Sequence, residues 1–209
     1  MNITKLKNTN NKVKLIYHIA DIHIRLDGRR QEEYEIVFDR LFDEITERKE
    51  DKEAIIVICG DIVHAKNEMN ANVIRLIIKL FVGLLRISDV IIILGNHDTN
   101  LYNRAKNNAL NYFVSLLNQL KFNKIFLLKD SGLYKYNNII FSVASIFDRV
   151  VIPAENIEGN EVKIALHHGQ VSGSITYNGF ELTNTIQKSK FEGYDAVMLG
   201  DIHKFQYLN

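Results

Sequence analysis

The chain has 209 residues, which is a usual length for one globular domain. Hydrophobic residues make up 46% and charged residues 24%, a balance that excludes a disordered, collagen-like or disulfide-scaffold protein. The 26 Lys and Arg residues against 25 Asp and Glu residues give a net charge of +1. A globally basic nucleic-acid-binding protein is therefore not indicated, although a local basic patch is compatible with this charge.

Cysteine usage and the distribution of apolar residues bear on the compartment. Cys59 is the single cysteine, so an intramolecular disulfide is excluded and a reducing compartment is favoured. The N-terminus has no apolar signal-peptide core, and no apolar run approaches the ~18 residues needed to span a bilayer. We expect an intracellular protein, of the cytoplasm or the nucleus or nucleoid, that is not secreted and has no membrane partner.

Short apolar, β-branched runs alternate with helical patterns along the chain. After a polar start, for which we predict no structure, the strand-like runs cover 13–19, 54–59, 90–94, 139–146, 162–166 and 196–199. Apolar residues recur at helical spacing in 30–49, 72–87 and 103–121. Runs that are apolar throughout predict strands covered on both faces, and the alternation predicts an α/β architecture with a largely parallel sheet.

One stretch departs from this alternation. Segment 133–146 has two strand-like halves around Asn137-Asn138, and asparagine tolerates the positive φ that a tight hairpin turn needs. We predict an antiparallel hairpin here, and hence a mixed sheet or a second sheet. Segment 153–161 holds the only proline and reads as a loop. Because no linker or repeat interrupts the chain, we predict one domain over residues 1–209.

Polar side chains of a few types follow five of the predicted strands. In chain order they are Asp21 and His23, Asp61 and His64, Asn96 with His97 and Asp98, His167 and His168, and Asp201 and His203. Of the 7 histidines, all except His18 lie in these clusters. Ligands bind at the carboxyl ends of parallel strands, so this concentration predicts a functional site at one edge of the sheet.

The types of side chain point to metals. Imidazole nitrogen and carboxylate oxygen without thiolate suit Mn, Fe or Zn, and there are more candidates than the four ligands of a structural zinc site. Two metals ~3.5–4 Å apart, bridged by a carboxylate, would use them and would stabilise in-line displacement at phosphorus. A single Asp at such a position is usually a turn former or helix cap, but the joint arrangement favours a site.

The motifs DIHIR, GDIVHAKN, GNHD, LHHGQV and GDIHK, in this order, resemble the calcineurin-like metallophosphoesterase superfamily. Within it they look most like the SbcD-type nuclease subunit of DNA double-strand-break repair, and the resemblance covers residues 15–206. It implies an α/β fold made of a two-sheet α-β-β-α sandwich, with mixed sheets flanked by helices.

The resemblance also implies a role for each residue of the motifs. Asp21, His23 and His203 would hold the first metal, Asp61 would bridge both metals, and Asn96 and His167 would hold the second. His97 would contact the scissile phosphate and help the leaving oxygen depart. His64 would stabilise charge on the phosphate, and Asp98 would orient His97.

Two features depart from the family pattern. The last motif is usually GHxH, but Asp201 stands here where a histidine of the second metal is expected. An Asp ligand would favour harder metals such as Mn or Mg; alternatively, the second metal is weakly held. The chain also ends at Asn209, before the DNA-binding capping domain and the ATPase-docking segment of the family. We expect either a fragment or a truncated family member.

The expected function is that of a hydrolase: a two-metal phosphodiesterase acting on DNA as an exonuclease or endonuclease, with Mn as the favoured metal and Mg, Fe or Zn as alternatives. The resemblance implies a homodimer through helix 30–49 or 103–121 and an SbcC-like ATPase partner. Arg25, Lys66 and Lys204 lie next to proposed ligands, where a DNA backbone would need positive charge. Two alternatives stay open: a phosphatase or small-molecule phosphodiesterase, and a catalytically weak truncated subunit that serves in assembly.

Overall fold

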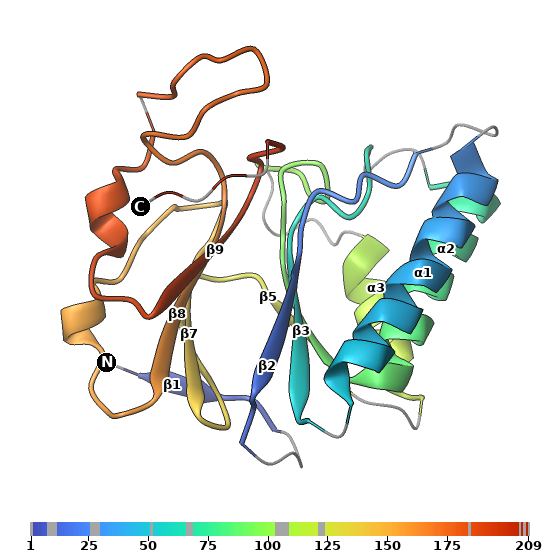
Figure 1. The fold of residues 1–209 in the computed structure, drawn as a ribbon, viewed down its shortest axis with the longest axis horizontal. Helices are drawn as coiled ribbons and strands as arrows, with labels where there is room; N and C mark the ends of the chain where they lie inside the picture. Colours follow the sequence, from blue (N-terminus) through green and yellow to red (C-terminus); the bar gives the residue numbers. More distant parts are fainter. Residues whose placement is uncertain are drawn as a thin grey trace.

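Within the described part of the chain, the strands form two sheets that pack face to face, with three α-helices on one side (Figure 1). The computed structural model describes residues 2–7, 12–25, 30–50, 52–65, 69–102, 109–120, 124–183, 185–204, 206 and 208. The strands of the first sheet and the strands of the second sheet that follow residue 138 direct their carboxyl ends to the same end of the molecule, so side chains that follow different strands can meet there.

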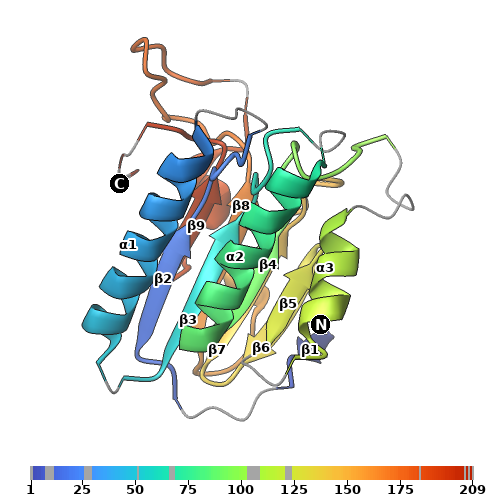
Figure 2. The same cartoon turned by 90° about the vertical axis from the view of Figure 1, so that its right-hand side faces the viewer.

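The first sheet has 4 strands, all parallel, in the order β2-β3-β4-β5. Its strands are β2 (Leu15–Ile19), β3 (Ala54–Cys59), β4 (Asp89–Ile93) and β5 (Ile125–Leu128). The connections are α1 (Gln31–Lys49), α2 (Ala71–Ile87) and α3 (Ala109–Leu117). All three helices cover the same outer face of this sheet (Figure 2).

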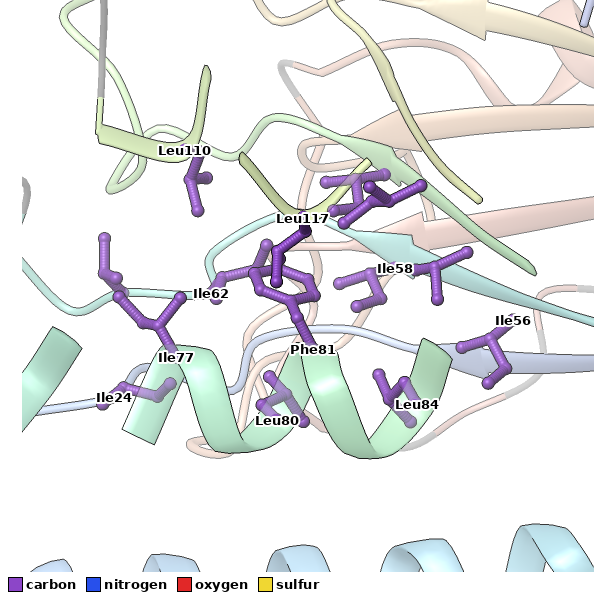
Figure 3. Close-up of a cluster of buried hydrophobic side chains, with 14 of the residues drawn as sticks. Ile24, Ile56, Ile58, Ile62, Ile77, Leu80, Phe81, Leu84, Leu110 and Leu117 are labelled. Carbon is purple, nitrogen blue, oxygen red and sulfur yellow. The ribbon is translucent and has the colours of Figure 1, made fainter. Parts of the chain in front are cut away.

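Helix α2 shows how the sequence produces this packing. The Asn70 side chain caps its first turn by accepting a hydrogen bond from the Val73 N–H at 2.9 Å. Its buried residues recur every three or four positions: Val73, Leu76, Ile77, Leu80, Phe81, Leu84 and Leu85. Figure 3 shows this face against Ile56 and Ile58 of β3, where it forms the core between helices and sheet.

The second sheet has 5 strands in the order β1-β6-β7-β8-β9. They are β1 (Ile3–Lys5), β6 (Gly132–Tyr136), β7 (Ile139–Ala144), β8 (Val162–His168) and β9 (Ala196–Gly200). Strands β6 and β7 are antiparallel and the other pairs are parallel. The predicted hairpin is therefore confirmed, and Asn137 in its turn has a φ of 53°.

Two strands were not predicted. Strand β1 lies in the polar start of the chain, where it pairs in parallel with β6 and contributes one apolar side chain, that of Ile3, to a hydrophobic cluster. Strand β5 pairs with β4 at the edge of the first sheet. The predicted helix over 103–121 is observed as α3; residues 103–108 and 121 lie outside the described residues.

Alternation along β3 divides its side chains between two cores. Ile56 and Ile58 face the helices, whereas Ile55, Val57 and Cys59 face the second sheet. The outer face of that sheet is covered by the short 3-10 helices η2 (Ala154–Asn156) and η3 (Lys188–Phe191) with their loops. The predicted mixed α/β architecture of two sheets flanked by helices is confirmed. None of the described helices combines the length and apolar character that crossing a membrane requires.

Candidate metal centre

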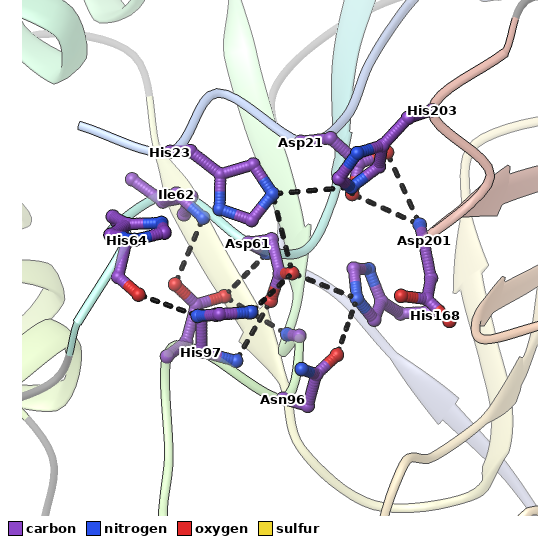
Figure 4. Close-up of polar contacts among 12 residues, drawn as sticks. Asp21, His23, Asp61, Ile62, His64, Asn96, His97, His168, Asp201 and His203 are labelled. Atoms are coloured by element: carbon purple, nitrogen blue, oxygen red, sulfur yellow. Dashed lines mark hydrogen bonds and ion pairs between the residues drawn. The ribbon is translucent and has the colours of Figure 1, made fainter. Parts of the chain in front are cut away.

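The candidate site lies where five strands from both sheets end (Figure 4). The first sheet contributes Asp21 and His23 after β2, Asp61 and His64 after β3, and Asn96 and His97 after β4; the second contributes His168 at the end of β8, and Asp201 and His203 after β9. The structure thus brings together side chains far apart in the chain, such as His23 and His203, which are 180 residues apart and whose Nε2 atoms lie 3.4 Å from each other.

The backbone at these strand ends is unusual. Four of the candidate residues have positive φ: Asp21 at 56°, His23 at 48°, Asp61 at 54° and Asp201 at 72°. Non-glycine residues rarely adopt this conformation, which costs of the order of 1–3 kcal/mol each and occurs preferentially at functional sites. The His23 N–H also donates to the Asp61 carbonyl at 2.9 Å, which fixes the first two loops to each other.

Two glycines let the strand ends approach one another. A Cβ on Gly95 would lie 2.1 Å from Asp61 Oδ1, and a Cβ on Gly200 would lie 2.1 Å from the Cys59 carbonyl oxygen. No larger residue fits at either place without moving the backbone. These glycines therefore set the spacing of the site.

Asp61 lies at the centre of the cluster and is 1% exposed. Its Oδ2 is 3.4 Å from His168 Nε2, 3.6 Å from His23 Nε2 and 4.0 Å from His97 Nε2. Burial by itself would raise the pKa of Asp61, but the hydrogen bond and charge of His168 hold it below the usual value. The centre of the site is thus a carboxylate surrounded by imidazoles.

His168 is oriented by the backbone on one side and faces the site on the other. Its Nδ1 lies 2.7 Å from the Cys59 carbonyl oxygen, so Nδ1 carries the proton that is donated there. Its Nε2 points to Asp61 and to Asn96 Oδ1, at 3.1 Å. Burial lowers the pKa of His168, but the adjacent Asp61 outweighs this effect and raises it to about 9.

Among the residues that the structure describes, three groups of side chains could each hold a metal ion, with ligand atoms that all lie within 4.8 Å of one another. They are Asp21, His23 and His203; Asp21, Asp61 and His168; and His23, His64 and His97. The Asp61 carboxylate approaches members of all three groups. The His23 Nδ1 atom is buried and, within the described part of the chain, has no hydrogen-bond partner.

His97 and His64 lie side by side at the margin of this cluster. Their rings stack with centroids 5.4 Å apart and an interplanar angle of 18°. His97 Nδ1 is hydrogen-bonded to the backbone carbonyl of His64, which assigns the proton to Nδ1 and turns Nε2 toward Asp61. The His97 ring is thereby held by the His64 backbone, with one nitrogen facing the metal groups.

The structure gives Asp98 a different role from the predicted one of orienting His97. Its buried carboxylate accepts four backbone N–H groups: those of Asp61 at 2.8 Å, Ile62 at 2.9 Å, Val63 at 3.1 Å and Gly95 at 2.9 Å. Burial raises the pKa of Asp98 to about 6, partly offset by these N–H donors. Asp98 therefore holds the loop that carries Asp61, and His97 is oriented by a carbonyl instead.

His168, not the predicted His167, faces Asp61 and Asn96. Successive side chains of a strand point to opposite faces. Leu166 packs between the sheets, so His168 lies on the inner side, while His167 faces outward near Phe191 with its Nδ1 bonded to the Ala144 carbonyl. One feature of the sequence could have distinguished His167 from His168. Lys163 is polar and lies on the same face of β8 as His167, which indicates that this face points outward.

Asp201 stands at the edge of the second group rather than within it. Its backbone N–H donates to both carboxylate oxygens of Asp21, at 3.0 and 3.1 Å. Among the described residues its own carboxylate belongs to none of the three groups; instead it lines a cavity together with Asn96 and His168. Burial raises the pKa of Asp201.

Comparison with known proteins agrees with this geometry. A sequence model of the calcineurin-like phosphoesterase family matches residues 14–205. The chain is also similar to "Uncharacterized protein R555" of Acanthamoeba polyphaga mimivirus, with 40% identity over 220 residues. That match covers 99% of this chain but only 16% of the length of the viral protein.

Proposed function

Since the chain belongs to the calcineurin-like phosphoesterase family, whose members hydrolyse phosphoesters with a pair of metals, we propose that it is a two-metal phosphodiesterase acting on DNA. The observation that carries the proposal is the position of the Asp61 carboxylate. It stands between Asp21, His23 and His203 on one side and His168 and Asn96 on the other. A shared carboxylate between two sets of ligands is what a dinuclear site requires.

The residues present fit two divalent metals. The first would be held by Asp21, His23 and His203, and the second by Asn96 and His168, with Asp61 bridging both. His168 replaces His167 in this assignment because its Nε2 is the nitrogen aimed at Asp61. Imidazole and carboxylate ligands without thiolate suit Mn, Fe or Zn. Mn is our choice because the Asp201 carboxylate, although outside the three ligand groups, lines the same cavity as Asn96 and His168 and places a hard oxygen beside the second site.

Bound metals would supply charge that stabilises the phosphate and lowers the pKa of the attacking water. The chain's own contribution is position. Asp61 is fixed by the Asp98 carboxylate, His168 by the Cys59 carbonyl and His97 by the His64 carbonyl. His97, when protonated on Nε2, can donate a hydrogen bond to the phosphate or to the departing oxygen, and His64 can stabilise charge next to it.

Two features support a nucleic acid as the substrate. The loop after β8 carries Tyr177 and Phe180, which are 74% and 71% exposed, and the Tyr177 hydroxyl donates to the His203 carbonyl at 2.7 Å. In Figure 1 this loop projects beyond the site end of the sheets. Exposed aromatic rings next to a phosphate-cleaving centre can stack on bases. Arg25 and Lys204 follow candidate ligands closely in the chain, while Lys66 lies outside the described residues.

The experiment compares substrates with the same metal. The purified protein is incubated with Mn2+ and single-stranded DNA, double-stranded DNA, p-nitrophenyl phosphate or bis(p-nitrophenyl) phosphate. We expect cleavage of DNA and of the diester, and little turnover of the monoester. Hydrolysis of the small esters with intact DNA would favour the phosphatase or small-molecule alternative. No turnover, together with a calorimetric titration showing at most one Mn2+ site, would favour the non-catalytic alternative.

The proposed assembly is tested separately. The homodimer and the SbcC-like ATPase partner stay predictions from the resemblance. Light scattering on the eluting protein measures its mass in solution, and a mass of one chain at micromolar concentration would contradict the homodimer.

A further inference from the structure

A cavity of about 370 Å3 opens beside the second group of ligands. One wall consists of Asn96, His168 and Asp201, so the cavity adjoins the position proposed for the second metal. The remaining wall is made by Leu101, Ile146, Arg149, His167, Gly169, Gln170 and Thr185. Cavities of 300–1,000 Å3 are the size that holds small organic ligands.

The polar groups of this wall offer hydrogen bonds to a neutral ligand. Thr185 Oγ1 is buried and, among the described residues, has no hydrogen-bond partner. Such a hydroxyl is costly unless something binds it. His167 Nδ1 donates to the Ala144 carbonyl, so in the neutral ring Nε2, which lies beside Gly169, is an acceptor. Gln170 adds an amide with both donor and acceptor atoms.

The charges of the wall argue against a second phosphate as the occupant. Arg149 is the one Arg or Lys among the lining residues, and it is exposed, whereas the Asp201 carboxylate belongs to the same wall. Leu101 and Ile146 contribute apolar surface, and Ile146 is 8% exposed. The lining is mostly polar, and its apolar side chains are those of Leu101 and Ile146. Neutral hydrogen-bonding groups beside a small apolar surface, with a carboxylate in the same wall, suit a flat heterocycle with polar edges better than an anion.

We propose that this cavity holds the nucleoside attached to the phosphate that reacts at the metal centre. The inference rests on the proposed function and deepens it by assigning a binding place to one nucleoside of the substrate. The base would meet Leu101 and Ile146 and form hydrogen bonds with Thr185, Gln170 and His167. Arg149, at the exposed margin, would contact the next phosphate of the strand.

Equilibrium binding tests the proposal without relying on turnover. Thymidine 5'-monophosphate and inorganic phosphate are titrated into the protein by calorimetry, both in Mn2+. We expect the nucleotide to bind at least about tenfold more tightly than phosphate. Thr185→Val should lower the affinity for the nucleotide about fivefold, which is the loss expected for one hydrogen bond, and should leave the affinity for phosphate unchanged. Thr183→Val, which alters an exposed threonine outside the lining, is the matched control and should change neither.

The outcomes separate this proposal from the one on which it rests. Equal affinities for nucleotide and phosphate, or no nucleotide binding, would overturn the nucleoside site. So would a Thr185→Val variant that weakens both ligands alike or neither. Turnover of bis(p-nitrophenyl) phosphate is then measured on the same preparations. Hydrolysis without a preference for nucleotide over phosphate would support the proposed phosphodiesterase and contradict the nucleoside site. A preference for nucleotide without hydrolysis would support the nucleoside site and contradict the proposed phosphodiesterase.

Discussion

Replacing Asp98 with asparagine should loosen the loop that carries Asp61, the proposed bridging carboxylate. Asp98 is 2% exposed, and its two oxygens accept hydrogen bonds from four backbone N–H groups. Three of these donors belong to the consecutive residues 61–63 after β3, and the fourth is Gly95 after β4. One carboxylate therefore joins two of the loops from which the metal centre is built.

The expected magnitude follows from how the donors are shared. Oδ1 accepts from Ile62 and Val63, and Oδ2 accepts from Asp61 and Gly95. Asparagine keeps one oxygen and places an NH2 group opposite the other two donors, so two buried N–H groups lose their acceptor. At about 1–3 kcal/mol for each unsatisfied group, the free energy of unfolding should fall by about 2–6 kcal/mol.

Urea denaturation followed by circular dichroism, at pH 7.5 and in a chelator, measures this change. At that pH Asp98, whose pKa burial raises to about 6, is ionised and can accept all four bonds. The exposed Asp43→Asn substitution on α1 is the control, and it should stay within about 0.5 kcal/mol of the parent protein. Asp98→Asn should also weaken Mn2+ binding. If its stability lies within 1 kcal/mol of the parent, Asp98 does not anchor the loop.

Four further predictions concern histidines. His97→Ala should lower the turnover of the diester about 10²–10⁴-fold while Mn2+ binding is retained. Kinetics measures the turnover and calorimetry the binding. The control His18→Ala should change neither. His168→Ala should abolish the binding of one of the two Mn2+ ions or lower its affinity about 10–100-fold. A titration in which His167→Ala has this effect instead would contradict the assignment of His168 to the second metal. The pKa of His168 is raised to about 9 beside Asp61, so below that pH each Mn2+ bound at this position should release a proton. In the metal-free protein the interaction of His168 with Asp61 should add about 3 kcal/mol to the free energy of unfolding below pH 6.5. This contribution should be lost as the pH rises through about 9. Denaturation of the parent protein and of His168→Ala at pH 6.5 and 9.5 measures the change.

The fold could be predicted wherever local pattern and tertiary packing agree. The run 54–59 is buried on both faces as β3, and the Asn137-Asn138 turn forms the expected hairpin. Strand β1 could not be predicted, because two of its three residues, Thr4 and Lys5, are polar and exposed. Its conformation depends on pairing with β6, which lies more than 120 residues away in the chain.

The site could be predicted as a set of strand ends, but not in its individual contacts. Asp21, Asp61, Asn96 and His203 converge as their positions after parallel strands implied. Motif letters could not choose between the adjacent His167 and His168, because the choice depends on which face of β8 packs against the first sheet. Nor could they show that Asp98 bonds to backbone N–H groups, since those partners have no side-chain signature.

The overlap of the three ligand groups indicates which imidazoles are left for the substrate. His23 belongs to two groups, but its Nε2 is already directed at His203 and Asp61, at 3.4 and 3.6 Å. If that nitrogen binds the first metal, it is not available to the group of His23, His64 and His97. In the proposed assignment two metals would then use Asp21, His23, Asp61, Asn96, His168 and His203. His64 and His97 would be left for the substrate: His97 Nε2 lies 4.0 Å from Asp61 Oδ2, and the His64 ring stacks on that of His97, so a phosphate bound at the metals would meet them.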